Sequence, residues 1–162
     1  MAVSERPIVV GVDGAEHSRA AVSWAAQEAR RRRVALHLVI SSDPARADYA
    51  EETLEAIAAD CRSEAPDLEI TEEVSLDHPI DTLVRRSAEA QLVVVGSRGR
   101  GGFVNALLGS VSAPLAAESA CPVIVMRPTR TRSGVLRGLP TVPRSRLRQD
   151  RQCRSAWIPA TR

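Results

Sequence analysis

Residues 92–102 decide the fold class of this chain, and they read Leu92-Val93-Val94-Val95-Gly96-Ser97-Arg98-Gly99-Arg100-Gly101-Gly102. The first five residues form a short, mostly β-branched run that ends in glycine, which is typical of a buried parallel strand. The glycines that follow predict a loop at the carboxyl end of this strand. A helix is expected over about 109–119, so the segment has the strand–loop–helix order of an α/β protein.

The same alternation extends on both sides of this segment. Four further short apolar runs predict strands, at 8–12, 34–40, 68–76 and 122–126. Helical spacing of apolar residues predicts helices at 18–33, with Ser18 as N-cap, at about 46–63, and after Pro79, which suits a first helical position. Five strands with intervening helices predict an α/β fold in which a five-stranded parallel sheet carries helices on both faces. The predicted folded domain spans 1–128.

Composition excludes several kinds of chemistry. All 22 basic residues are arginine, and without lysine the chain has no phosphate-loop lysine, Schiff base or lysine general base. Aromatic residues make up 2%, too few for base-stacking platforms. Neither the three scattered cysteines nor the three scattered histidines form a metal-binding pattern. No apolar run is long enough for a membrane span, and the polar start of the chain has no signal-peptide core, so we expect a cytoplasmic protein.

Charge divides the chain into two parts. The first 126 residues carry 12 arginines and 19 of the 20 acidic residues, whereas 127–162 carry ten arginines and only Asp150. This Arg- and Pro-rich composition predicts a disordered tail over 129–162. Its simplest interpretation is a solvated appendage, or a reading-frame accident at the end of the gene. An electrostatic arm for nucleic acid or for an acidic partner, and self-association with the acidic body, are the alternatives.

The glycine loop has the chemistry of a phosphate cradle. Glycines let backbone N–H groups approach a phosphate closely, a helix starting near Gly109-Ser110 would direct free N–H groups to it, and Arg98 or Arg100 would neutralise charge. If the first and fourth strands are neighbours, Asp13 faces this loop across the crevice where strand order reverses. Asp13 is then a candidate ligand for a ribose hydroxyl or a magnesium ion. The alternative is a flexible surface turn without a ligand. A GxGxxG dinucleotide fingerprint is not found after the first strand.

The spacing Gly96-x2-Gly99-x9-Gly109-Ser110 resembles the G-2x-G-9x-G-[S/T] nucleotide motif of the universal stress protein family. Three other segments resemble the family as well: residues 9–14 with Ser18 behind them, residues 92–99, and residues 121–126. The resemblance covers about 5–128 in order. It implies a Rossmann-like sheet of order 3-2-1-4-5, ATP in the crevice between the first and fourth strands, and often a homodimer through the last strand, Val123–Met126.

Carried over by position, the resemblance assigns the nucleotide site to Gly11, Val12, Asp13, Ser41, Gly96, Ser97, Arg98, Gly99, Arg100, Gly101, Gly102, Gly109, Ser110 and Val111. Ser41 would offer backbone groups to adenine, although Ser41-Ser42 replaces the apolar residues usual there. Two further departures lie outside the phosphate motif. His78 stands where a glycine commonly precedes the proline, and Gln91 stands where an aspartate commonly precedes the fourth strand.

Three functions are compatible with these features. The first is an ATP-binding regulator of a stress response, in which nucleotide occupancy shifts dimerisation or partner binding. The second is a slow ATPase, which would need a base to activate water that the sequence does not indicate. The third is an interaction module of the same fold that binds no nucleotide, against which the intact glycine motif argues. We expect the regulator, with ATP, with or without magnesium, as its ligand and a homodimer as its assembly.

Overall fold

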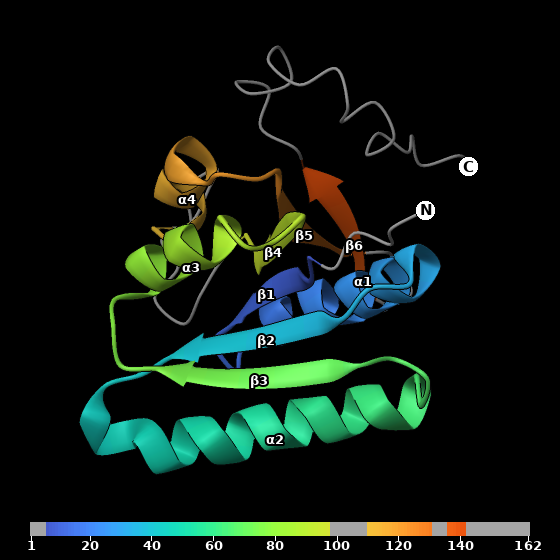
Figure 1. Cartoon of the computed structure of the whole chain (residues 1–162), viewed down its shortest axis with the longest axis horizontal. Coiled ribbons are helices and arrows are strands. Elements are labelled where there is room, and N and C mark those ends of the chain that lie inside the picture. The colour runs from blue at the N-terminus through green and yellow to red at the C-terminus, as the bar shows by residue number, and fades with distance from the viewer. Residues whose placement is uncertain (1–5, 98–109, 131–135, 142–162) are drawn as a thin grey trace.

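The computed structural model describes residues 6–97, 110–130 and 136–141, and a six-stranded sheet of order β3-β2-β1-β4-β5-β6 forms its centre (Figure 1). The strands are β1 (Ile8–Val12), β2 (Leu36–Ser41), β3 (Ile70–Ser75), β4 (Leu92–Gly96), β5 (Val123–Arg130) and β6 (Leu136–Thr141). The first five are parallel, which confirms the predicted sheet and its order 3-2-1-4-5. β1 is central: Ile8 pairs with Leu36 of β2 on one side and with Leu92 of β4 on the other.

Helices cover both faces of this sheet, as predicted. They are α1 (Glu16–Arg32), α2 (Ala47–Glu64) with the short 3-10 turn η1 (Pro44–Arg46) before it, α3 (Pro79–Ser87) and α4 (Ser112–Glu118). α1 and α2 pack on one face, where their apolar side chains join those of Ile8, Leu36 and Leu38. α3 and α4 pack on the other face, over Val9, Val93 and their neighbours. None of the described helices combines the length and the apolar composition that crossing a bilayer requires.

The start of α1 differs from the prediction, which placed Ser18 at the N-cap. The helix begins at Glu16, and Ala15 is the N-cap. The reason lies in the preceding turn: Asp13 Oδ1 accepts a hydrogen bond from the Ala15 N–H at 2.9 Å, and Gly14 has a φ of 75°. Ser18 lies inside the first turn, and its hydroxyl donates to the Ala15 carbonyl at 2.7 Å. The side chain of Asp13, and not that of Ser18, therefore orders the backbone at the start of α1.

The strand β6 was not expected. The sequence predicts disorder for 129–162, whereas within that segment the structure describes Thr129 and Arg130 as the end of β5 and Leu136–Thr141 as β6. β6 runs antiparallel to β5, with Val125 opposite Thr141 and Arg130 opposite Leu136. A pairing of this kind depends on backbone groups rather than on apolar periodicity, so the Arg- and Pro-rich composition did not reveal it.

Candidate functional site

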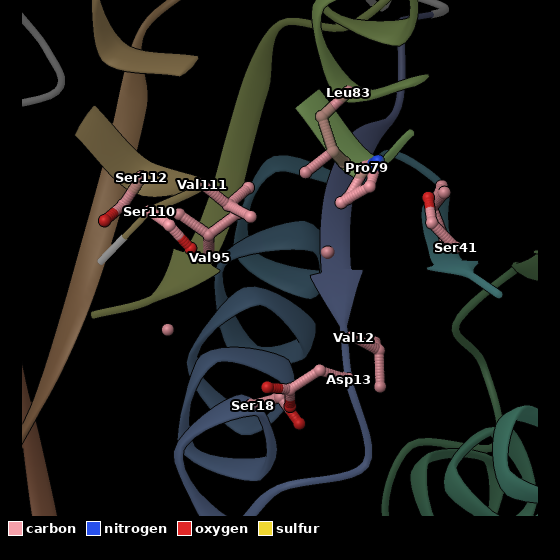
Figure 2. A pocket seen from close by; sticks show the side chains of 13 residues that line it. Val12, Asp13, Ser18, Ser41, Pro79, Leu83, Val95, Ser110, Val111 and Ser112 are labelled. Atoms are coloured by element: carbon pink, nitrogen blue, oxygen red, sulfur yellow. The ribbon is translucent and has the colours of Figure 1, made fainter. Parts of the chain in front are cut away.

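A crevice opens at the carboxyl ends of β1 and β4, between α3 and the turn that precedes α4 (Figure 2). In a parallel sheet this is the place where strand order reverses, since the chain passes from β1 outward to β3 and then returns to β4. The lining residues are Gly11, Val12, Asp13, Ser18, Val39, Ser41, Pro79, Leu83, Val95, Gly96, Ser110, Val111 and Ser112.

Half of the predicted site residues meet in this crevice. They are Gly11, Val12, Asp13, Ser41, Gly96, Ser110 and Val111. Ser97, by contrast, is buried, and its N–H donates to the Met126 carbonyl at 2.7 Å, continuing the ladder between β4 and β5. The remaining six lie outside the described residues: Arg98, Gly99, Arg100, Gly101, Gly102 and Gly109. The structure thus brings together the part of the predicted cradle at the end of β1 and the part before α4. The roles of these residues toward a ligand stay predictions.

The Asp13 carboxylate lies at the mouth of the crevice in Figure 2. One of its oxygens is committed to the turn through the Ala15 N–H. The other oxygen, Oδ2, makes no hydrogen bond within the described part of the chain. A carboxylate held in this way can accept a hydrogen bond from a ligand hydroxyl without rearranging the backbone.

Gly11 lines the crevice, and the absence of a side chain at this position leaves space for its neighbours. A Cβ built at this position would lie 3.0 Å from Leu83 Cδ1 and 3.1 Å from Val95 Cγ1. Leu83 belongs to α3 and Val95 to β4, so a side chain here would require these two side chains to shift by a few tenths of an ångström. The glycine therefore leaves room for Leu83 to pack closely over the floor of the crevice.

The sequence patterns did not indicate the wall formed by α3. Pro79 occupies the first turn of this helix, and His78 is its N-cap, with Nδ1 accepting from the Ile80 N–H at 3.4 Å. Pro79 and Leu83 face the crevice opposite Val111 (Figure 2). The strand order contained the signal, since a helix that connects β3 to β4 must cross over β2 and β1 and so can form a wall beside the end of β1.

The helix predicted to begin near Gly109-Ser110 begins at Ser112, and Ser110 and Val111 form a turn. Pro114 explains the difference. Proline has no N–H and its ring clashes with the carbonyl four residues earlier, so it is tolerated only in the first helical turn. A helix starting at Ser110 would place Pro114 beyond that turn. A start at Ser112 places Pro114 at the third helical position, so the lining from this side is a turn followed by a short helix.

A second hollow continues from the crevice past Asp13 and Ser41, which line both. Its other side is formed by η1 and the first turn of α2, including Arg46 and the exposed ring of Tyr49. Neither hollow contains a metal-binding cluster: within the described ranges, no three His, Cys, Asp or Glu side chains come together. A magnesium ion at Asp13 would thus depend on ligand phosphates and water for most of its coordination.

A model of the universal stress protein family matches residues 5–127, nearly the whole length over which the five parallel strands extend. The chain belongs to the universal stress protein family. The resemblance noted from the glycine motif is thereby confirmed.

Relatives within the family include universal stress protein Rv2623 of Mycobacterium tuberculosis, which is 42% identical over 139 residues, covering 78% of this chain and 47% of the relative. A universal stress protein of Mycolicibacterium smegmatis is 39% identical over 137 residues, with coverages of 77% and 47%. The chain therefore spans about half the length of these curated relatives.

Solved universal stress proteins share the fold. A member in complex with cAMP superposes with a TM-score of 0.63 at 30% identity, covering 74% of this chain and 94% of that protein. The protein from Archaeoglobus fulgidus in complex with dAMP gives 0.61 at 27% identity, with coverages of 74% and 96%. The structure of MJ0577 gives 0.64 at 17% identity over 79% of this chain and 99% of that chain, which bears on the fold alone.

Two departures from the usual universal stress protein pattern have structural roles and do not line the crevice. Gln91, at the amino end of β4, donates to the Arg6 carbonyl at 2.8 Å and accepts from Arg32 at 3.0 Å. His78 caps α3, as described above. Both side chains fix the ends of secondary-structure elements.

Proposed function

We propose that this universal stress protein binds an adenine nucleotide, ATP, in the crevice and acts as a nucleotide-dependent regulator in a stress response. One observation carries the proposal: the carboxyl ends of β1 and β4 and the Ser110-Val111 turn converge on one crevice at the point where strand order reverses. The cAMP and dAMP complexes of solved relatives support an adenine nucleotide as the class of ligand.

The nucleotide would lie with its phosphates toward Ser110 and its base toward Ser41. In this arrangement Asp13 Oδ2, which makes no hydrogen bond to the described residues, accepts one from the ribose. Gly96 and the glycines after it wrap the phosphates together with Ser110 and Val111. The hollow beyond Ser41 leaves the base side open to a larger group.

The described lining supports binding rather than catalysis. Asp13 is the one titratable side chain among the described residues that line the crevice, and it is already engaged in the β1–α1 turn. Hydrolysis of ATP would need a positioned base and neutralisation of the charge that develops on the transferred phosphoryl group. We therefore propose a binding protein whose turnover, if measured, falls below about 1 s⁻¹, the low end for dedicated enzymes.

The first experiment identifies the small molecules that the purified, tag-free protein releases on denaturation, by chromatography. Near-stoichiometric ATP or ADP supports the proposal, and the ratio of the two reports on hydrolysis. A protein that releases nothing is titrated with ATP and magnesium by calorimetry. No binding up to millimolar concentration, weaker than about −4 kcal/mol, would overturn the nucleotide proposal in favour of an interaction module.

A second experiment uses glycine substitutions. Gly99→Val places a branched side chain where the motif predicts close approach to a phosphate, and we expect affinity to fall at least tenfold, about 1.4 kcal/mol. Gly134→Val is the matched control outside the motif and should leave the affinity unchanged. A folded Gly99→Val protein with normal ATP affinity would remove the glycine loop from the site.

A third experiment separates two roles of Asp13. Asp13→Asn keeps an oxygen that can accept from the Ala15 N–H but removes the negative charge, whereas Asp13→Ala removes both. If Asp13 binds the ribose, Asp13→Asn weakens ATP binding mildly with or without magnesium. If it binds magnesium, only the magnesium-dependent part of the affinity is lost.

A further inference from the structure

The two edges of β5 have partners over different stretches of its length. β4 pairs with β5 from Val123 to Met126, and β6 pairs with the opposite edge from Val125 to Arg130. Val125 and Met126 therefore have partners on both sides. The backbone of β5 beyond Met126 has its sheet partner in β6, within the part of the chain that the structure describes.

The homodimer that the family resemblance implies would use the same edge of β5. One edge of a strand can pair with only one partner strand at a time, because each N–H and C=O group points to one side. A second copy approaching Val123–Met126 would thus meet β6 along Val125 and Met126. The intramolecular and intermolecular pairings exclude one another over these residues.

The two edges differ in their suitability for pairing. The run from Val123 to Met126 is apolar, mostly β-branched and uncharged, and such an edge readily pairs with another chain when it is exposed. β6 contains Arg137, Gly138 and Pro140, and charge, glycine and proline are the features that make an edge strand a poor partner. β6 is the last strand on this side of the sheet (Figure 1), so with β6 in place the sheet ends in an edge whose composition disfavours further pairing.

We propose that β6 caps the edge of the sheet and competes with a second copy of this chain for the outer edge of β5. Only residues 131–135 separate the two strands in the sequence, and a connection of this length gives an effective concentration on the order of millimolar. A second copy at micromolar concentration loses this competition. The chain is then a monomer until β6 leaves the edge, and it dimerises when β6 is released. This inference does not depend on nucleotide binding.

The test measures mass in solution by light scattering coupled to size-exclusion chromatography, on the full chain. The variant Gly138→Pro with Leu139→Pro removes two successive N–H groups of β6. Successive N–H groups of a strand point to opposite edges, so one of the two faces β5. The control, Arg146→Pro with Leu147→Pro, places the same proline pair outside β6. We expect the wild type and the control to be monomers at micromolar concentration and the β6 variant to double its mass.

Hydrogen exchange on the same proteins reports whether β6 is paired. In the wild type, protection at Thr129 or Arg130 requires β6, because β4 reaches only as far as Met126. We expect this protection to be lost in the β6 variant while that of β1 and β4 is retained. If the proline pair prevents folding, Leu136→Gly with Leu139→Gly lowers the strand propensity of β6 without proline and takes its place.

Four outcomes would overturn the proposal. The first is a wild type that is already as dimeric as the β6 variant. The second is a variant that loses protection at Thr129 and Arg130 yet stays monomeric. In the third, a wild-type dimer dissociates in the variant, so that β6 itself is the interface. In the fourth, the wild type shows no protection at Thr129 and Arg130.

Discussion

The two faces of the sheet are covered by helices of very different length. On one face, α1 and α2 have 17 and 18 residues and pack a continuous apolar layer against the strands. On the other, α3 and α4 have nine and seven residues and cover only part of the sheet. The crevice lies on the side with short helices, because those helices leave the carboxyl ends of β1 and β4 open. The long-helix face chiefly stabilises the fold, and the short-helix face provides the site.

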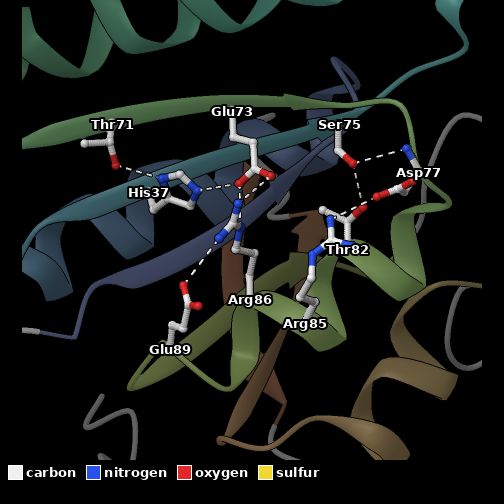
Figure 3. Close-up of polar contacts among 9 residues, drawn as sticks. All are labelled: His37, Thr71, Glu73, Ser75, Asp77, Thr82, Arg85, Arg86 and Glu89. Carbon is white, nitrogen blue, oxygen red and sulfur yellow. Dashed lines mark hydrogen bonds and ion pairs between the residues drawn. The ribbon is translucent and has the colours of Figure 1, made fainter.

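The short-helix face also contains a polar network (Figure 3). It lies at β3, which contributes no residue to the apolar cluster on this face. His37 bonds Thr71 through Nδ1 at 2.7 Å and Glu73 through Nε2 at 2.8 Å. Arg86 of α3 donates twice to the Glu73 carboxylate, at 2.7 and 2.9 Å, and also reaches Glu89. Hydrogen bonds and charge thus connect α3 to β2 and β3 at the place where apolar packing on this face ends.

The largest expected effect tests the long-helix face. Leu38 is fully buried in the cluster under α1 and α2, and truncation to alanine there costs about 2 to 5 kcal/mol of the free energy of unfolding. Leu38→Ala should leave the ATP affinity of the folded protein unchanged. Leu83→Ala is the matched control on the other face, and because Leu83 lines the crevice we expect it to weaken ATP binding about fivefold, roughly 1 kcal/mol. Urea unfolding and calorimetry measure both, and equal effects on binding would break the contrast between the faces.

The next effect concerns the network at Glu73. Burial raises the pKa of this carboxyl, but hydrogen bonds and charges from Arg86 and His37 outweigh burial and place the pKa below its ordinary value. A lowered carboxyl pKa contributes stability above the unfolded value of about 4.3, and this is lost as pH falls through the folded pKa. Glu73→Gln should therefore cost about 1.5 to 3 kcal/mol at neutral pH.

The pH dependence of that cost is the decisive readout. Urea unfolding of the wild type and Glu73→Gln should differ by a constant amount at neutral pH, and the difference should shrink below about pH 4. Glu28, whose pKa is also lowered on balance, is unchanged in both proteins and so cancels from the comparison. A difference that stays the same down to pH 3 would show that the loss comes from packing rather than from charge.

Gly11→Ala tests the floor of the crevice. The added methyl group would contact Leu83 and Val95 at 3.0 and 3.1 Å, and such overpacking costs about 1 to 3 kcal/mol. Combining Gly11→Ala with Leu83→Ala makes room for the methyl group, so the double variant should be more stable than the sum of the single effects predicts. Strict additivity in thermal or urea unfolding would show that α3 does not rest on this glycine.

The smallest effect is expected at the rim of α3. Arg85 donates to Asp77 at 3.0 Å, but the two side chains are 52% and 60% exposed. Exposed ion pairs of this kind contribute little, so Arg85→Ala should change the free energy of unfolding by less than about 0.5 kcal/mol. A larger loss would mean that the rim of α3, and not only its buried side, fastens the helix to the sheet.

Local sequence signals predicted the parallel strands and the helix that Pro79 opens, because β-branched runs ending in glycine and a proline in the first turn determine conformation over a few residues. They placed the start of α4 too early by neglecting Pro114. The crevice wall at Leu83 and the bonds from Arg86 to Glu73 join residues of different elements, and β6 is recognised only by its pairing with β5. Such contacts follow from how elements pack, and no single segment indicates them.

The central position of β1 has a consequence for the synthesis of the protein. β1 is made before both of its partners and pairs with β2 after about 30 residues, but its other edge waits for β4, whose register begins at Ile8 opposite Leu92. Until the ribosome has delivered β4, an apolar strand that will be buried on both sides has one edge open to other nascent chains. Slow translation between β3 and β4 would prolong this exposure, and rapid passage through α3 would shorten it.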